Sequence, residues 1–180
     1  WEIDPMTVQQ VKIMTLSEWA QGSRWRVELC HPCDAHRLIW ITRGQGIASI
    51  QGQRRGIGSH SAIVIPAGTL FSIDMGKQGF GLVCRIPARS LILMPDEPEL
   101  LRIRDVQMQG ELTSLLETMQ REQSAARAFM DEAMNAQAAL VTVWLRRAMI
   151  HQGPATGKTP AALRLVHAYS ALVARDFRLG

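Results

Sequence analysis

Cysteine and histidine side chains gather in one short stretch of the sequence, at a spacing that could hold a metal ion. Cys30, Cys33 and His36 form a Cys-x-x-Cys-x-x-His pattern. Thiolates and imidazoles are good ligands for Zn²⁺, but a closed structural site needs four of them, and no second paired cluster exists. The residues that could complete the site are His31, His60 and Cys84. We therefore expect no bound metal, and Cys30, Cys33 and His36 are the residues that would hold one.

Two other patterns look like catalytic or nucleotide-binding motifs but lack the context of those motifs. Ser59-His60-Ser61 sets a base beside two hydroxyls, yet no nucleophile elbow or glycine-rich oxyanion segment accompanies it. The segment GPATGKT at 153–159 has three residues between its glycine and Gly-Lys, where a phosphate-binding loop has four. We therefore expect no enzyme activity and no cofactor.

The pattern of apolar residues changes once along the chain and predicts strands before helices. From about 25 to 86, short apolar runs are separated by glycine and proline, which is typical of strands joined by tight turns in a barrel or sandwich. Gln51-Gly52-Gln53 indicates a hairpin, because glycine accepts the positive φ that such turns require. The expected strands cover 25–29, 38–41, 47–50, 62–65, 70–73 and 80–86.

Helical spacing replaces the short runs after Pro87. The first helix is indicated by Leu112, Leu115, Leu116 and Met119. A second helix is expected over 124–151, and its apolar side would carry Phe129, Ala133, Leu140, Val143 and Trp144. The composition of 152–157 is that of a linker, and Thr159-Pro160 can begin a third helix.

The stretch from His36 to Phe71, HRLIWITRGQGIASIQGQRRGIGSHSAIVIPAGTLF, resembles the two core motifs of the cupin superfamily. In that family a His-x-His pair, a glutamate and a later histidine bind a divalent metal. His36 matches the first histidine, but Leu38 and Phe71 stand at ligand positions, and no glutamate precedes Gly44. The resemblance implies an antiparallel β-barrel, a double-stranded β-helix, that has lost its metal.

A metal-free cupin followed by helices resembles the N-terminal half of AraC/XylS-type bacterial transcription regulators. The segments FGLVCRIPARSLI, ELTSLLETMQREQ and AQAALVTVWLRRAMI carry this resemblance, and TPAALRLVHAYSALVARDF resembles the helix that leads into their DNA-binding domain. An α+β fold is implied, with an effector-binding barrel and N-terminal arm at 1–90, a helical dimerisation module and linker at 91–157, and the start of a further helix at 158–180. DNA would be bound only through a helix-turn-helix domain that this chain lacks, so we expect no specific operator binding by the chain itself.

The family register implies which side chains face the barrel interior. His36, Leu38, Trp40 and Thr42 would point inward together, since side chains alternate along a strand. The expected ligand-binding residues are Trp25, His36, Leu38, Trp40, Phe71 and Cys84. Such an apolar, aromatic pocket with His36 as a polar group suits a small aromatic or carboxylated effector. The alternative is that these side chains only fill the barrel.

The helices are expected to make a homodimer. One helix face must cover the barrel, and a second apolar face would pair with a partner subunit. The expected dimerisation residues are Leu112, Leu115, Leu116, Met119, Leu140, Val143 and Trp144. The alternative is that these stripes only cover the barrel.

Composition sets the remaining bounds. The 180 residues are 47% hydrophobic and 20% charged, as in ordinary folded proteins, and no apolar run approaches the ~18 residues that span a bilayer. A cytoplasmic protein without a membrane partner is expected. The net charge of +4 comes from scattered basic residues and does not itself favour a nucleic-acid partner. Two competing functions stay open: a cupin isomerase or dioxygenase that uses His31, His36 and His60, and a purely structural dimerisation module.

Overall fold

The computed structural model describes residues 10–21, 31–32 and 35–152. The chain divides into two compact units, Trp1–Ala148 and Met149–Gly180, and the description below concerns the first. The strand expected at 25–29, with Trp25, lies outside the described residues, as do Cys30, Cys33, the linker and the third helix. The domain boundaries expected after residues 90 and 157 stay predictions.

The strands of the first unit form two antiparallel sheets. The five-stranded sheet has the order β1-β8-β3-β6-β9, built from β1 (Lys12–Thr15), β8 (Phe80–Pro87), β3 (Ala35–Arg43), β6 (Ser61–Ile65) and β9 (Glu99–Arg102). The four-stranded sheet has the order β2-β7-β4-β5, built from β2 (His31–Pro32), β7 (Leu70–Asp74), β4 (Gly46–Ile50) and β5 (Gln53–Ile57). The predicted α+β class with antiparallel sheets is confirmed. The described strands pair as two open sheets, so the closed barrel is not shown.

Among the described residues, four short strands, β1, β2, β5 and β9, and two short helical segments were not foreseen. β1 and the helix α1 (Leu16–Gln21) precede the expected strands, a 3-10 turn η2 (Gly76–Gln78) precedes β8, and β9 follows them. β9 pairs with β6, so the segment after Pro87 contributes a strand to the five-stranded sheet.

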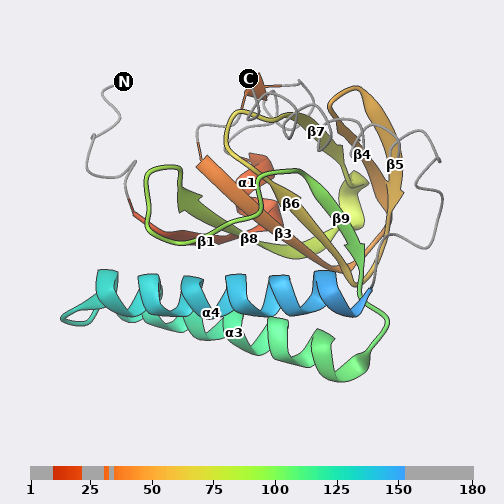
Figure 1. Ribbon diagram of the computed structural model, residues 1–180. Helices are drawn as coiled ribbons and strands as arrows, with labels where there is room; N and C mark the ends of the chain where they lie inside the picture. The colour runs from red at the N-terminus through yellow and green to blue at the C-terminus, as the bar shows by residue number, and fades with distance from the viewer. Residues whose placement is uncertain (1–9, 22–30, 33–34, 153–180) are drawn as a thin grey trace, which may run out of the picture. The chain divides into compact units, whose positions relative to one another are not determined.

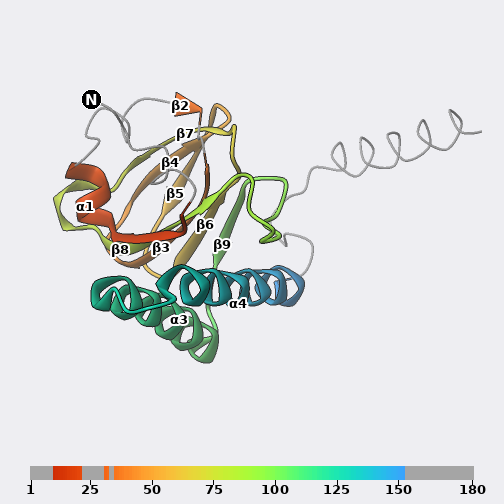
Figure 2. The same ribbon diagram turned by 90° about the vertical axis from the view of Figure 1, so that its left-hand side faces the viewer.

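The two sheets pack face to face, and two long helices cover the other face of the five-stranded sheet (Figures 1 and 2). The core between the sheets is apolar and includes Ile39, Ile63 and Val83 from the five-stranded sheet and Ala48 and Phe71 from the four-stranded sheet. The first unit therefore has three layers: the helices, the five-stranded sheet and the four-stranded sheet.

The central strand β3 is turned by one residue relative to the expectation. Ile39 and Ile41 belong to the core between the sheets, whereas Trp40 bonds to a helix. Leu38 lies on the same side as Trp40 because side chains alternate along a strand. Cys84 also lies there, because it stands opposite Leu38 in the β3–β8 ladder. The inward orientation expected for Leu38, Trp40 and Cys84 is therefore wrong: they face the helices.

The helix α3 (Val106–Ala125) begins and ends with clear local signals. The Asp105 carboxylate caps it by accepting hydrogen bonds from the backbone N–H groups of Gln107, at 2.8 Å, and Met108, at 3.3 Å. It ends at Ala126, whose φ of 46° is left-handed. The helix α4 runs over Met130–His151. The second helix therefore does not start near Ser124, because Ser124 still belongs to α3.

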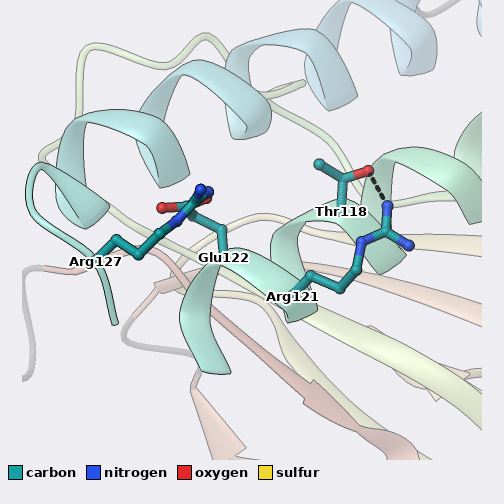
Figure 3. A network of polar contacts seen from close by, with 4 residues as sticks. All are labelled: Thr118, Arg121, Glu122 and Arg127. Atoms are coloured by element: carbon teal, nitrogen blue, oxygen red, sulfur yellow. Dashed lines mark hydrogen bonds and ion pairs between the residues drawn. The ribbon is translucent and has the colours of Figure 1, made fainter. Parts of the chain in front are cut away.

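Polar contacts accompany the end of α3 (Figure 3). Arg127, just after the helix, forms an ion pair with Glu122. Arg121 donates a hydrogen bond of 3.0 Å to the Thr118 hydroxyl, which itself donates to the Ser114 carbonyl at 2.8 Å. Arg127 is largely exposed, so we expect the ion pair to contribute about 0.2–1 kcal/mol at most. It ties the turn between α3 and α4 to the end of α3.

The buried side of α4 differs from the one expected. Trp144 is buried as predicted, but Phe129 lies before the helix with 78% of its surface exposed, and Leu140 is 51% exposed. The residues that α4 buries are Met134, Ala138, Val141, Thr142, Trp144, Leu145 and Ala148. No helix in the described ranges is long and apolar enough to cross a bilayer.

Glycines of the cupin-like motif are required by close approach of the backbone. A Cβ on Gly44 would lie 2.9 Å from the Gln78 carbonyl oxygen, and the φ of Gly44 is 104°. A Cβ on Gly46 would collide with the Asp74 carbonyl and lie 2.9 Å from the Met75 Cα. Glycine at position 46 therefore allows the start of β4 to lie close against the end of β7.

The helix α3 also contacts the edge of the five-stranded sheet. The Gln123 side-chain amide accepts a hydrogen bond from the Ile13 N–H and donates one to the Ile13 carbonyl, each 2.8 Å long. Ile13 lies in β1, which is an edge strand. A helix side chain thus occupies the position that a neighbouring strand would take.

Candidate functional site

The outer face of β3 joins the five-stranded sheet to both helices. The Trp40 ring is fully buried, and its Nε1–H donates a hydrogen bond of 3.0 Å to the Thr113 hydroxyl of α3. The same ring meets the Trp144 ring of α4 edge-on, with centroids 6.4 Å apart. Trp144 Nε1–H in turn donates to the Met108 carbonyl of α3 at 3.1 Å. Sheet, α3 and α4 therefore meet at two tryptophans.

The inner face of β3 lies in the space where a ligand was expected. Ile39 and Ile41 are fully buried there. Phe71 reaches this core from the four-stranded sheet, and Trp19 of α1 stacks on it with ring centroids 6.0 Å apart and planes 8° apart. The inward position of Phe71 is therefore as expected. Its neighbours, however, are Trp19 and the odd-numbered residues of β3. Ligand binding by Phe71 stays a prediction.

His36 lies at the end of β3 beside the turn that follows β6. Its Nδ1 accepts a hydrogen bond of 3.0 Å from the Ala67 N–H, so the neutral ring carries its proton on Nε2. Partial burial lowers the pKa of His36 below its ordinary value of 6.5, and the nearby charge of Asp96 opposes this shift. Burial therefore favours the neutral form of His36, and the hydrogen bond from Ala67 ties its ring to the turn that contains Pro66, Ala67 and Gly68.

We expect His36 to make the folded protein less stable as the pH falls. Its pKa is lower folded than unfolded, so the unfolded chain binds the proton more tightly, and stability declines as the pH falls from about 6.5 toward the lowered pKa. His36→Asn should flatten this dependence, because an amide oxygen can accept the Ala67 N–H bond at every pH. Urea denaturation at several values between pH 5 and 8 measures the effect. An equal slope in both proteins would contradict it.

The described residues do not bring the expected metal ligands together. Ile41 stands opposite Ser61, next to His60, and His36 lies five residues away along β3, a separation of about 17 Å. Two ring nitrogens that share a Zn²⁺ ion each lie about 2 Å from it. His36 and His60 are therefore too far apart to bind one ion. Within the described ranges no three His, Cys, Asp or Glu side chains form a group that could hold a metal.

Cys84 is a buried thiol on the helix side of the five-stranded sheet. Complete burial raises its pKa to about 12, because an apolar environment disfavours the thiolate. A protonated, inaccessible thiol is a poor metal ligand and a poor nucleophile. Cys84 therefore acts as a small apolar side chain in the packing of the sheet against the helices.

The expected dimerisation residues fall into two groups. Four of them are buried within the chain: Leu112, Leu116, Met119 and Trp144. Leu115 and Val143 are half-buried, and Leu140 is the most exposed of the seven. The first group holds the helices on the sheet, so a partner subunit could reach only the second. Dimerisation itself stays a prediction.

No protein-family model matches the chain, and no curated protein matches it significantly. Among solved structures, the AraC-like transcriptional activator CuxR is similar over 96% of this chain and 62% of its own, at 10% identity and a TM-score of 0.49. ToxT from Vibrio cholerae O395, bound to (E)-4-(8-methylnaphthalen-1-yl)but-3-enoic acid, is similar over 77% of this chain and 55% of its own, at 9% identity and a TM-score of 0.43. A cupin protein from Bacteroides fragilis is similar over 47% of this chain and 70% of its own, at 17% identity and a TM-score of 0.30. The chain thus spans less than two thirds of the length of the two regulators.

Several residues at these junctions were not singled out from the sequence. Thr113 and Gln123 are single polar residues on a helix, and nothing in their spacing indicates a partner in the sheet. Trp19 had a signal, since Thr15 and Glu18 form a capping box: Glu18 N–H donates to the Thr15 hydroxyl at 3.1 Å, and Thr15 N–H donates to the Glu18 carboxylate at 2.8 Å. That pattern predicts a helix start and hence a helical Trp19.

Proposed function

We propose that this chain is the effector-sensing and dimerisation region of an AraC-type transcription regulator. The cupin-like motif and the helical segments named above support the family. The placement of β3 supports the mechanism and is the observation that carries the proposal. Its odd residues line the core between the sheets, and its even residue Trp40 holds both helices.

A ligand between the sheets would act on the helices through this strand. An effector changes a conformational equilibrium only if it binds one arrangement more tightly than the other. Expansion of the apolar core would move Ile39 and Ile41, and Trp40 lies between them on the same backbone. The helices would then shift against the sheet through the contacts of Trp40 with Thr113 and Trp144.

The helical pair is proposed as the dimer interface. Leu115, Leu140 and Val143 retain exposed surface, and they are the residues that we expect a second copy to cover. Replacing Leu140 by aspartate should shift the protein toward the monomer in sedimentation, with Ser114→Asp on exposed α3 surface as the control. If Leu140→Asp dimerises as strongly as the parent protein, the interface lies elsewhere.

A role without catalysis is part of the proposal. The metalloenzyme alternative requires His36 and His60 at one ion, and their separation along β3 and β6 opposes this. The metal content of the purified chain tests it. If the chain binds about one transition metal tightly, and removal of that metal abolishes an activity, the enzyme hypothesis replaces the sensor hypothesis.

The central experiment combines ligand binding with hydrogen exchange. The 180-residue chain is heated with aromatic and aliphatic carboxylates, their alcohols, and neutral sugars. We expect at least one class to raise Tm saturably, since a ligand at a hundred times its Kd stabilises the folded state by about 2.7 kcal/mol. The same compound should change amide exchange in α3 and α4. Trp40→Phe, which lacks the bond to Thr113, should bind it but transmit less of the change to the helices.

Two results would overturn the proposal. Failure of every compound to raise Tm would favour a purely structural module. A compound that protects the sheets while exchange in α3 and α4 stays unchanged would show a binding domain without the proposed coupling.

A further inference from the structure

The strand β5 forms an exposed edge of the four-stranded sheet. It pairs with β4 on one side, and the order β2-β7-β4-β5 places no described strand on its other side (Figure 1). Its residues from Gln53 to Gly56 are all exposed. The edge strand β1 differs, because Gln123 already bonds to both backbone groups of Ile13. The edge at β5 is therefore open to a further strand.

The hairpin between β4 and β5 determines which backbone groups of β5 point outward. Its loop consists of Gln51 and Gly52, with φ of 49° and 78°, as in a type I′ turn. The residue pair next to such a loop exchanges hydrogen bonds, and hydrogen-bonded pairs then alternate with pairs that are not bonded. Arg54 and Gly56 belong to pairs of the second kind. Their N–H and C=O groups therefore point away from β4.

Two neighbouring arginines set the charge that this edge accepts. Arg54 and Arg55 are both exposed, and their side chains point to opposite faces because side chains alternate along a strand. Arg54 stands opposite Ser49 on the outer face, since the next residue of β4, Ala48, belongs to the core between the sheets. Pairing of two β5 strands would bring four arginines to one edge, and like charges in a sheet repel each other. The edge therefore favours a strand with an acidic residue opposite Arg54.

Gly56 leaves room for a large side chain on the same outer face. A Cβ on Gly56 would meet nothing within 4 Å. Gly56 stands opposite Ile47, whose side chain is 44% exposed. A large side chain on an added strand can lie across an edge glycine and cover the apolar residue beyond it. The edge thus offers an apolar contact and a cation two residues apart.

We propose that β5 binds an extended segment of another protein by strand addition. The segment carries an aromatic or large aliphatic residue opposite Gly56 and an acidic residue opposite Arg54. In the antiparallel orientation, which is the more stable one, its sequence from the N-terminus is apolar, any residue, acidic. Backbone hydrogen bonds supply the affinity, and the two side chains supply the selectivity. This protein-binding edge is additional to the proposed effector sensing and does not depend on it.

The test titrates the 180-residue chain with the blocked peptide acetyl-Thr-Thr-Tyr-Thr-Glu-Thr-Thr-amide at millimolar concentration, by calorimetry. N-methylation of the tyrosine and glutamate amides, which would bond to β5, should weaken binding about tenfold or more. N-methylation of the threonine amide between them, which points away from β5, is the matched control and should leave binding nearly unchanged. Replacing the peptide's glutamate by lysine should weaken binding about fivefold.

A charge reversal on the protein locates the site. Arg54→Glu should reverse the preference, so that the lysine peptide binds more tightly than the glutamate peptide. Arg104→Glu makes the same charge change at another exposed position and should keep the preference of the parent protein. Because both side chains are exposed, we expect both variants to fold with the urea midpoint of the parent.

Four results would overturn the proposal. One is the absence of binding by every peptide, and another is equal binding of the two N-methylated peptides, which would exclude strand addition. An unchanged preference in Arg54→Glu would place the peptide elsewhere. A change in the sedimentation of the chain with Arg54→Glu, without peptide binding, would assign β5 to a second copy of this chain instead of an acidic partner.

Discussion

Replacing Trp40 by alanine should cost about 3–5 kcal/mol of the free energy of unfolding, the range for removal of a buried aromatic side chain. The ring is fully buried, and its loss leaves a cavity between the sheet and both helices. The Thr113 hydroxyl loses its donor, and Trp144 loses its edge contact. Urea denaturation followed by circular dichroism measures the cost. Because small domains have only about 5–15 kcal/mol in total, we expect a large fall in the urea midpoint.

Milder variants separate the hydrogen bond from the packing of the ring. Trp40→Phe keeps most of the aromatic surface and removes the N–H donor, so it should cost about 1 kcal/mol or somewhat more. Thr113→Val removes the acceptor. If the two groups interact as described, the double variant should cost clearly less than the two single costs added together. Strict additivity would contradict the bond, and a Trp40→Ala cost below about 1 kcal/mol would contradict the junction itself.

Gly46→Ala should produce the second large effect. The new methyl group would collide with the Asp74 carbonyl and lie 2.9 Å from the Met75 Cα, and neither is the flexible end of a side chain. Forcing an extra methyl group into a packed interior typically costs 1–3 kcal/mol. We expect about 3 kcal/mol here because backbone must move. The measurement is again the free energy of unfolding in urea.

Gly56→Ala is the matched control for this substitution. Gly56 lies in β5, the strand paired with β4, and a Cβ there would meet nothing within 4 Å. Alanine should be neutral or slightly stabilising, since it restricts the unfolded chain more than glycine does. Equal effects of the two substitutions would show that the close approach of β4 to the end of β7 is not what makes Gly46 necessary.

The strand pattern was readable from the sequence, but the orientation of β3 was not. Five of the six expected strands coincide with β3, β4, β6, β7 and β8, and the Gly52 hairpin has the expected positive φ of 78°. Within β3, however, Leu38 to Ile41 are all fully buried. A run that is apolar on both faces has no alternation from which to assign its sides. The assignment came from the family register. That register placed Leu38 and Trp40 in the interior, although they face the helices.

The helix boundaries failed for a related reason. The turn after α3 has Ala126 in a left-handed conformation, and Phe129 also has a positive φ. Neither residue type signals such a conformation, so the sequence gives no indication of a break there. The second helix is also apolar over much of its surface, so its apolar residues do not define one buried side. The helix was expected to start at residue 124 and starts at Met130, and the buried side inferred for it was wrong as well. The burial of Trp144 was predicted correctly, because so large an apolar side chain is expected to be buried even when the helix start is misplaced.

The candidate site was only partly accessible to sequence reasoning. Phe71 was expected in the interior and lies there. His36 was expected as a polar group of the pocket, and its hydrogen bond with Ala67 instead ties it to a turn.

The amide of Gln123 has a consequence for association between chains. An edge strand offers its unpaired N–H and C=O groups to any other strand, which is how sheets join into aggregates. At Ile13 both groups already have a partner in Gln123. A second chain could extend the sheet past β1 only by displacing this side chain and the end of α3 with it. The same contact that holds the helix in place therefore protects the protein against growth of its sheet from this edge.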